Sequence, residues 1–190
     1  GPQGVGEGLE VSENHTEARL RLTLAVPLTQ REKFEWILQK GTELGVGAFQ
    51  PFISKYSLIQ SLELEEARRQ RWEAIIREAA EQSERGRLPI LLAPLSFSEA
   101  LKAALKNGRV FFGAERGGTL GLAAACPENM GEMGVTWMVG PEGGFSQDET
   151  GQAASSGAVL VSLGPRILRL ETAALTGAAI LLAAAGDLGG

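Results

Sequence analysis

The feature that most constrains this chain is a regular alternation of short apolar segments with longer segments of helical periodicity. Apolar segments of about five residues are typical of buried strands, and apolar residues spaced three and four apart are typical of helices. The predicted strands are 20–26, 48–53, 90–93, 109–114, 135–139 and 158–163. The predicted helices are 32–44, 64–82, 96–106, a segment after Ser146, and 171–185. This order predicts an α/β fold with a mostly parallel sheet flanked by helices.

Two of the predicted helices begin with a capping signature. Ser96 is followed three residues later by Glu99, and Ser146 by Glu149. In such a capping box each side chain accepts a hydrogen bond from the backbone N–H of the other residue. The signatures therefore predict where these two helices begin.

Length and composition indicate one cytoplasmic domain preceded by a short tail. The chain has 190 residues, which suits a single α/β domain. Residues 1–18 are rich in glycine and polar side chains, so they are predicted to be a tail or linker remnant before a domain at 19–190. The single cysteine, Cys126, precludes an intramolecular disulfide or a cysteine zinc cluster. No signal peptide is recognisable, and the apolar segment 173–185 is too short to span a membrane.

The charge pattern leaves two interpretations open. The net charge of −5 argues against a dedicated nucleic-acid-binding protein, which is usually basic. Six arginines nevertheless lie within twenty residues: Arg68, Arg69, Arg71, Arg77, Arg85 and Arg87. They form either a local basic face or a solvated helix with intermixed glutamates.

Two glycine-containing loops follow predicted strands and are candidates for a ligand site. In open parallel sheets, ligands bind beyond the carboxyl ends of the strands. The loop 140–144, GPEGG, matches neither the phosphate loop nor the GxGxxG dinucleotide pattern, and Glu142 would repel a phosphate. It suits a neutral or cationic ligand contacted through backbone groups, although a tight turn without function is an alternative.

The second loop, 163–169, carries two arginines at the start of a very apolar helix. Arg166 and Arg169 lie beside Glu171. An ion pair within the helix or the loop would explain them structurally, although two arginines at the start of a deeply apolar helix are unusual for a structural connection.

Together, four segments resemble the SPOUT class of methyltransferases, and within it the family that makes N3-methyluridine in 16S ribosomal RNA. They are 39–46 (QKGTELGV), 78–89 (EAAEQSERGRLP), 139–149 (VGPEGGFSQDE) and 163–176 (LGPRILRLETAALT). The similarity extends from about Leu22 to the C-terminus.

The resemblance implies a C-terminal deep trefoil knot that holds S-adenosylmethionine between the two loops. It also implies a homodimer, with the segment 173–185 as an interface element. Family members carry a small N-terminal barrel domain, for which there is no room before Leu20, so the chain is expected to be the catalytic domain alone. The residues implied to bind the cofactor are Gly113, Met138, Gly140, Gly144, Leu163, Ile167 and Leu168.

The implied reaction is transfer of a methyl group to uracil N3 in 16S rRNA, within the assembled small ribosomal subunit. Arg166 and Arg169 would stabilise the negative charge that uracil acquires when N3 loses its proton, and Glu142 would orient an arginine or accept that proton. Arg85, Arg87 and Gln82 are candidate contacts to RNA, with the partner subunit an alternative for the two arginines and a plain helix surface one for Gln82.

Two positions depart from the family pattern. Gln30 and Tyr56 stand where a lysine and an arginine are expected, and both are expected at positions that face the RNA rather than the cofactor. Three other functions are weighed against this assignment: ribose 2′-O-methylation by another SPOUT enzyme, a non-catalytic RNA-binding protein of ribosome assembly, and a nucleotide-binding dehydrogenase. The last is disfavoured because no GxGxxG follows a strand.

Overall fold

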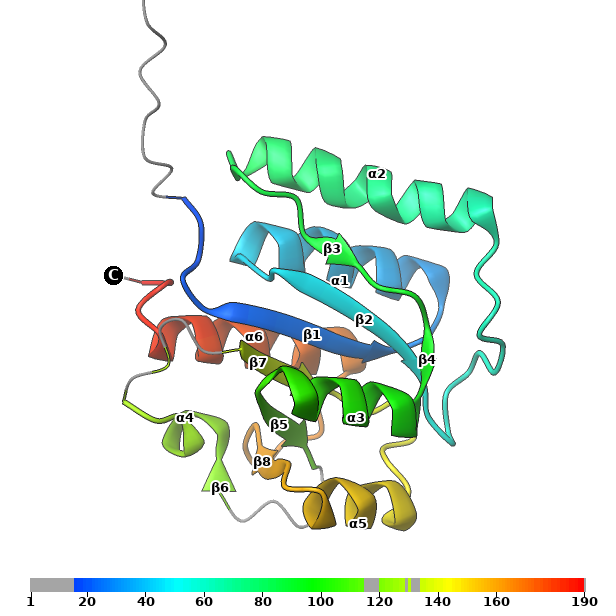
Figure 1. The fold of residues 1–190 in the computed structure, drawn as a ribbon, viewed down its shortest axis with the longest axis vertical. Helices are drawn as coiled ribbons and strands as arrows, with labels where there is room; N and C mark the ends of the chain where they lie inside the picture. Colours follow the sequence, from blue (N-terminus) through cyan, green and yellow to red (C-terminus); the bar gives the residue numbers. More distant parts are fainter. Residues whose placement is uncertain (1–15, 115–119, 129, 131–133, 190) are drawn as a thin grey trace, which may run out of the picture.

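The computed structural model describes residues 16–114, 120–128, 130 and 134–189, and its centre is one twisted sheet (Figure 1). The strands are β1 (Arg21–Pro27), β2 (Ala48–Ile53), β3 (Ile90–Leu91), β4 (Leu95–Ser96), β5 (Arg109–Gly113), β6 (Leu120–Gly121), β7 (Gly134–Met138) and β8 (Val159–Ser162). Their order is β3-β2-β1-β7-β5-β8-β6, with β4 also paired to β2. Every pairing among the described strands is parallel. The predicted mostly parallel α/β sheet is thus confirmed.

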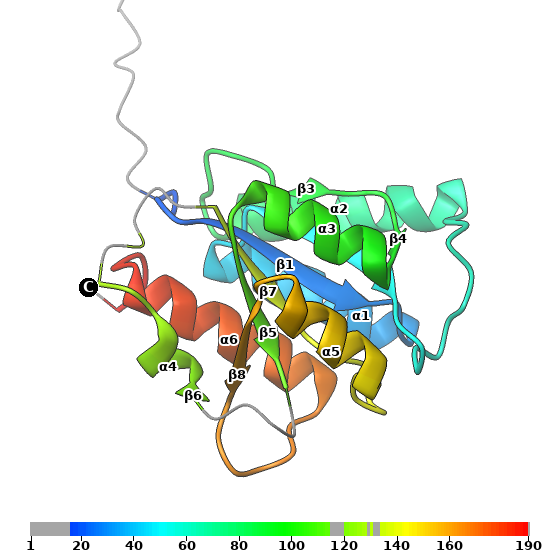
Figure 2. The same ribbon diagram turned by 60° about the horizontal axis from the view of Figure 1, so that its bottom comes forward.

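Helices cover both faces of the sheet (Figures 1 and 2). They are α1 (Arg31–Leu44), α2 (Glu66–Gln82), α3 (Phe97–Asn107), α4 (Leu122–Ala125), α5 (Gln147–Ser155) and α6 (Leu170–Ala184). The first apolar cluster joins the strands to α1, α2 and α6. The second joins the opposite face to α3 and α5. Because the central strands are buried on both faces over most of their length, their sequences are largely apolar.

Strand β7 illustrates how the pleat divides neighbouring residues between the two clusters. Trp137 packs in the first cluster and Met138 in the second. The Trp137 indole donates from Nε1 to the backbone oxygen of Ala173 at 3.2 Å. A Cβ atom added to Gly177 would overlap that ring, so glycine at this position lets α6 lie directly against β7.

The long elements were predicted correctly and the very short ones were missed. Both capping boxes are present, since the side chains of Ser96 and Ser146 accept from the N–H of Glu99 and Glu149. The strand predicted at 90–93 comprises only residues 90–91, and β4, β6 and α4 were not predicted. Elements of two to four residues are too short to produce a recognisable periodicity.

The domain makes its first described contacts slightly before the predicted boundary at residue 19. Thr16 Oγ1 donates to the backbone oxygen of Glu84 at 2.9 Å, and Glu17 forms an ion pair with Arg85. Thr16 and Glu17 therefore contact the domain, the rest of the predicted tail lies outside the described residues, and the division into tail and domain stays a prediction. In the described part of the chain, no helix is long and apolar enough to cross a membrane. The trefoil knot stays a prediction.

Candidate active site

A cavity of about 300 Å³ opens at the carboxyl edge of the sheet, where β5, β7 and β8 end. We call it the strand-end cavity. It is lined by residues 113–114, 137, 139–142, 144–145, 161–170 and 173. It thus brings together the two loops that the sequence singled out, which adjoin because β5 lies between β7 and β8 in the sheet. Its volume is at the small end of the range of ligand sites.

The first loop, 140–144, is fixed to the start of α1 through Glu142. Glu142 Oε1 accepts from Lys33 Nζ at 2.7 Å and from Thr29 Oγ1 at 3.1 Å. Partial burial raises the pKa of Glu142, but the hydrogen bonds from Lys33, its own backbone N–H and Thr29 outweigh this and hold the pKa below its ordinary value. A carboxylate that stays ionised places a negative charge beside the cavity and is a weak proton acceptor.

The second loop, 163–169, lines the cavity and carries unpaired backbone donors. Gly164 has φ +112°, in the region that favours glycine, and its N–H donates to Ser162 Oγ. Within the described part of the chain, the backbone N–H groups of Arg166, Ile167 and Leu168 have no hydrogen-bond partner. Three unpaired donors on the wall of a cavity are suited to bind the acceptor atoms of a planar ligand.

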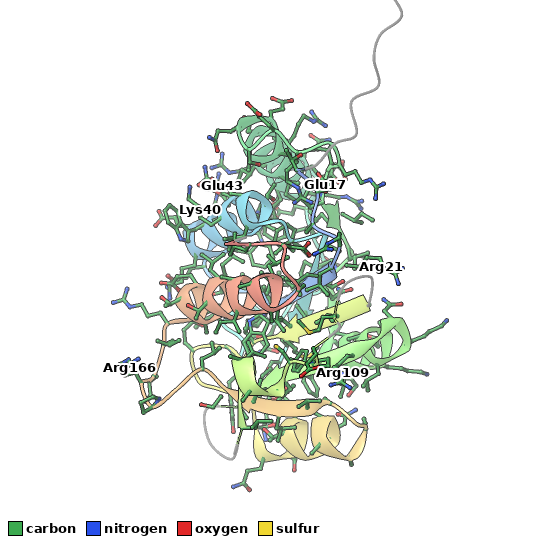
Figure 3. The ribbon with its side chains drawn as sticks, turned by 90° about the vertical axis from the view of Figure 1, so that its left-hand side faces the viewer. Glu17, Arg21, Lys40, Glu43, Arg109 and Arg166 are labelled. Atoms are coloured by element: carbon green, nitrogen blue, oxygen red, sulfur yellow. The ribbon has the colours of Figure 1, made fainter. Side chains whose placement is uncertain are left out.

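Both arginines of this loop line the cavity and are exposed. Figure 3 shows Arg166 on the loop that leads into α6. Among the described residues, neither the Arg166 side chain nor the Arg169 side chain forms a hydrogen bond or ion pair, so the ion pair with Glu171 considered from the sequence is not formed. Two unpaired guanidinium groups at the mouth leave it attractive to an anionic group.

Of the seven residues predicted to bind the cofactor, six line the cavity and Met138 does not. The Met138 side chain is fully buried in the cluster on the opposite face. Sequence reasoning missed Trp137, whose place in the lining follows from strand alternation, because 135, 137 and 139 share one face. Packing also requires glycine at positions 113 and 140. An added Cβ atom would lie 2.8 Å from the Trp137 ring at Gly113 and 3.0 Å from the Phe145 ring at Gly140.

The predicted RNA contacts Gln82, Arg85 and Arg87 lie at the opposite edge of the sheet. Gln82 and Arg87 are exposed, but the Arg85 side chain is only 5% exposed. Its Nη1 donates to the backbone oxygens of Thr42, near the end of α1, and of Val46, just before β2 begins, and Nη2 donates to Glu17. Figure 3 shows Glu17 and Arg166 far apart on the molecule. Within one chain these residues are separated from the cavity, and the buried hydrogen bonds of Arg85 favour a structural role.

Comparison with known proteins gives consistent results over nearly the whole described chain. The family model of the RNA methyltransferase domain matches residues 16–182. The chain is 36% identical over 171 residues to Ribosomal RNA small subunit methyltransferase E of Synechocystis, which covers 90% of this chain and 55% of that protein. It is 34% identical to the protein of the same name from Bacillus subtilis, over 88% of this chain and 67% of that one. The chain therefore spans about 55% of the length of the first relative and 67% of the second.

Solved structures are similar in fold as well as in sequence. A Ribosomal RNA small subunit methyltransferase E from Neisseria gonorrhoeae, bound to S-adenosylmethionine, superposes with a TM-score of 0.73 at 35% identity, covering 86% of this chain and 65% of that one. A protein from Legionella pneumophila, solved in complex with the same bound cofactor, superposes with a TM-score of 0.79 at 31% identity, over 88% and 68% of the two chains.

Proposed function

This chain belongs to the RNA methyltransferase domain family, and we propose that it transfers a methyl group from S-adenosylmethionine to N3 of a uridine in 16S ribosomal RNA. The proposal rests chiefly on the strand-end cavity, which combines unpaired backbone donors with two unpaired arginine side chains at its mouth. Relatives named for small-subunit ribosomal RNA methylation support the substrate. A cytoplasmic location follows from that substrate.

The residues of the cavity fit the proposed cofactor. The unpaired N–H groups of 166–168 suit the acceptor nitrogens of adenine, and Leu163 and Val139 provide apolar walls. The ionised carboxylate of Glu142 suits a cationic ligand, and Gly140 and Gly144 allow the backbone to approach it closely. When bound, S-adenosylmethionine would supply a methyl group already activated by a positively charged sulfonium.

The chain's own contribution is positioning and charge stabilisation. Uracil N3 carries a proton in its neutral form, and its loss spreads negative charge onto the two carbonyl oxygens. Arg166 and Arg169, exposed at the mouth, would stabilise this charge through planar guanidinium donors. Because Glu142 is held ionised by Lys33, it acts chiefly as the anchor of the loop rather than as the base.

Three further features complete the proposal. The loop that joins β8 to α6 would pass through the trefoil knot that the family resemblance implies. The active form would be a homodimer with α6 in the interface, because its partly exposed Leu175, Ala179 and Ile180 offer an apolar surface. The RNA would be recognised in the assembled small subunit.

Calorimetric titration of S-adenosylmethionine tests the cofactor site. We expect one cofactor per chain, and about three- to tenfold weaker binding for Ile167→Ala, which removes part of an apolar wall. Ile167 is 83% exposed, so its truncation spares the fold, and Ile90→Ala on the distant edge strand is the matched control at 60% exposure. A substitution at Gly140 is a less suitable test of cofactor binding, because the new side chain would also clash with the Phe145 ring and disturb the packing. Absence of binding to the folded wild type would refute the cofactor site.

The reaction is tested by locating the methyl group. Small subunits from a strain that lacks the modification are incubated with cofactor, and the 16S rRNA is digested and analysed by mass spectrometry. The proposal requires N3-methyluridine, and 2′-O-methylation would favour the alternative activity. We expect Arg166→Met and Arg169→Met to reduce the rate of methyl transfer with little change in cofactor affinity. If both variants transfer the methyl group as fast as the wild type, the arginines have no part in the mechanism.

A further inference from the structure

A second cleft lies at the same carboxyl edge of the sheet, beyond the ends of β2 and β4. Its volume is about 310 Å³, and it is lined by residues 53–55, 60, 96–98, 148–149 and 152. It shares no lining residue with the strand-end cavity, and apart from Ile53 and Phe97 its lining is polar. Because parallel sheets bind ligands beyond their carboxyl ends, this position suits a binding site.

Ser54 in this cleft has a buried hydroxyl without a hydrogen-bond partner. The residue is only 1% exposed, and its Oγ forms no hydrogen bond to any described residue. Its backbone groups are satisfied, since its N–H donates to Ser57 Oγ at 2.9 Å and its carbonyl oxygen accepts from Gln60 Nε2 at 3.2 Å. A buried hydroxyl left unpaired is costly, and a polar group of a ligand in the cleft would offset the cost.

Some other polar groups of the cleft are available to a ligand, whereas Glu149, Gln60 and Ser96 are engaged in hydrogen bonds of their own. Gln152 Oε1 accepts from Ser98 Oγ at 3.1 Å, which leaves the Gln152 side-chain amide free to donate. The cleft includes the first turn of α3, whose leading N–H groups have no intrahelical acceptor. Lys55 forms no ion pair among the described residues, and its Nζ lies 5.7 Å from the centre of the Tyr56 ring. Asp148 contributes a carboxylate.

This combination matches the sugar and phosphodiester of a ribonucleotide. The ammonium of Lys55 and the helix N–H groups suit the single negative charge of a phosphodiester. The Ser54 hydroxyl, the Gln152 amide and the Asp148 carboxylate suit a ribose 2′-hydroxyl, which both donates and accepts. Asp148 at the same time disfavours a free phosphate with its higher charge.

Tyr56 connects this cleft to the strand-end cavity. A Cβ atom added to Gly143 would lie 3.2 Å from the Tyr56 Cβ, so the loop after β2 abuts the loop that lines the cavity. The Tyr56 ring is half exposed and can stack on an unpaired base. We propose that the second cleft binds the ribose and phosphodiester of a nucleotide that neighbours the target uridine, with Ser54 Oγ bonded to its 2′-hydroxyl. This inference rests on the proposed function, because it takes RNA as the substrate.

Binding of a short single-stranded oligouridylate and its 2′-deoxy counterpart, followed by fluorescence anisotropy at several salt concentrations, tests the proposal. We expect Ser54→Ala to weaken RNA binding about three- to tenfold and to leave DNA binding unchanged. Its melting temperature should stay equal or rise, because an unpaired buried hydroxyl is removed. Lys55→Gln should lower the slope of log K against log salt by about 0.7 for one lost phosphate contact. Lys102→Gln, an exposed lysine on α3 outside the cleft, is the matched control.

The outcomes separate this inference from the proposed function. An unchanged preference for RNA in Ser54→Ala, together with an unchanged salt slope in Lys55→Gln, would overturn the assignment of the cleft, whatever the wild type methylates. Failure of the wild type to bind either oligonucleotide would also overturn it, while titration of S-adenosylmethionine decides the cofactor site independently. If the cofactor is not bound but Ser54→Ala loses the preference for RNA, the cleft assignment stands and the proposed function fails.

Discussion

Replacement of Arg85 by glutamine tests whether this arginine supports the fold or contacts RNA. Its guanidinium is 5% exposed and donates to the carbonyl oxygens of Thr42 and Val46 at 3.1 and 2.7 Å, and to Glu17 at 3.0 Å. Removing one partner of such a buried pair costs about 3–5 kcal/mol. We expect about 3 kcal/mol, because the Glu17 side chain is 17% exposed and keeps its hydrogen bond from the N–H of Arg87. For a domain of this size, that lowers the melting temperature by about 6–12 °C.

The assay is chemical denaturation of the wild type, Arg85→Gln and the neighbouring control Arg87→Gln, whose exposed side chain should matter by less than about 0.5 kcal/mol. Partial burial raises the pKa of Glu17, but its hydrogen bonds and the charge of Arg85 outweigh this and lower the pKa below 4.5. The ion pair therefore stabilises the fold above pH 4.5, and this stabilisation is lost as the pH falls through the lowered pKa. The destabilisation by Arg85→Gln should shrink over that range. Equal stability of both variants at neutral pH would refute the structural role.

Three further predictions concern packing, capping and pH. Gly177→Ala should force Trp137 to shift and weaken cofactor binding at least several-fold, at a stability cost of about 1–3 kcal/mol. Gly151→Ala, with open space around it, should stabilise α5 by up to about 1 kcal/mol. Calorimetry and denaturation measure the two effects, and equal effects would contradict the packing argument. Glu149→Ala should cost about 2 kcal/mol, because three donors to this buried carboxylate lose their acceptor; a loss below about 0.5 kcal/mol would rule out this role. Glu142→Gln should make stability depend less on pH below 4.5, because the lowered pKa of Glu142 means that the wild-type fold is stabilised by the ionised carboxylate. Parallel profiles of stability against pH in the two proteins would show that this carboxylate is not linked to folding.

The sequence predicted an element correctly wherever the residues of that one segment are enough to specify it. The capping boxes at Ser96 and Ser146 specify helix starts through side chains three residues apart, and both are present. The long helices follow from apolar residues spaced three and four apart, and the central strands follow from apolar segments of about five residues. Strand β4 and strand β6 have two residues each and exist only because a neighbouring strand offers a parallel partner.

The candidate site was likewise predictable in part from the sequence. The glycine loops at 140–144 and 163–169 were recognisable because they follow very apolar strands, and they do line one cavity. The family resemblance implied Met138, whereas its neighbour Trp137 lines the cavity and Met138 packs on the opposite face. A fully buried parallel strand is apolar on both faces, which removes the alternation that would have distinguished them.

By itself, the sequence determined the fold class, the long elements and the family, because these depend on local patterns and on motifs in a fixed order. The tertiary structure alone decided which distant groups meet. It buried Arg85 against Glu17, left Arg166 unpaired at the cavity and left the Ser54 hydroxyl without a partner. The physical reason is that burial and pairing depend on strand order, and strand order brings together residues whose separation along the chain carries no local signal.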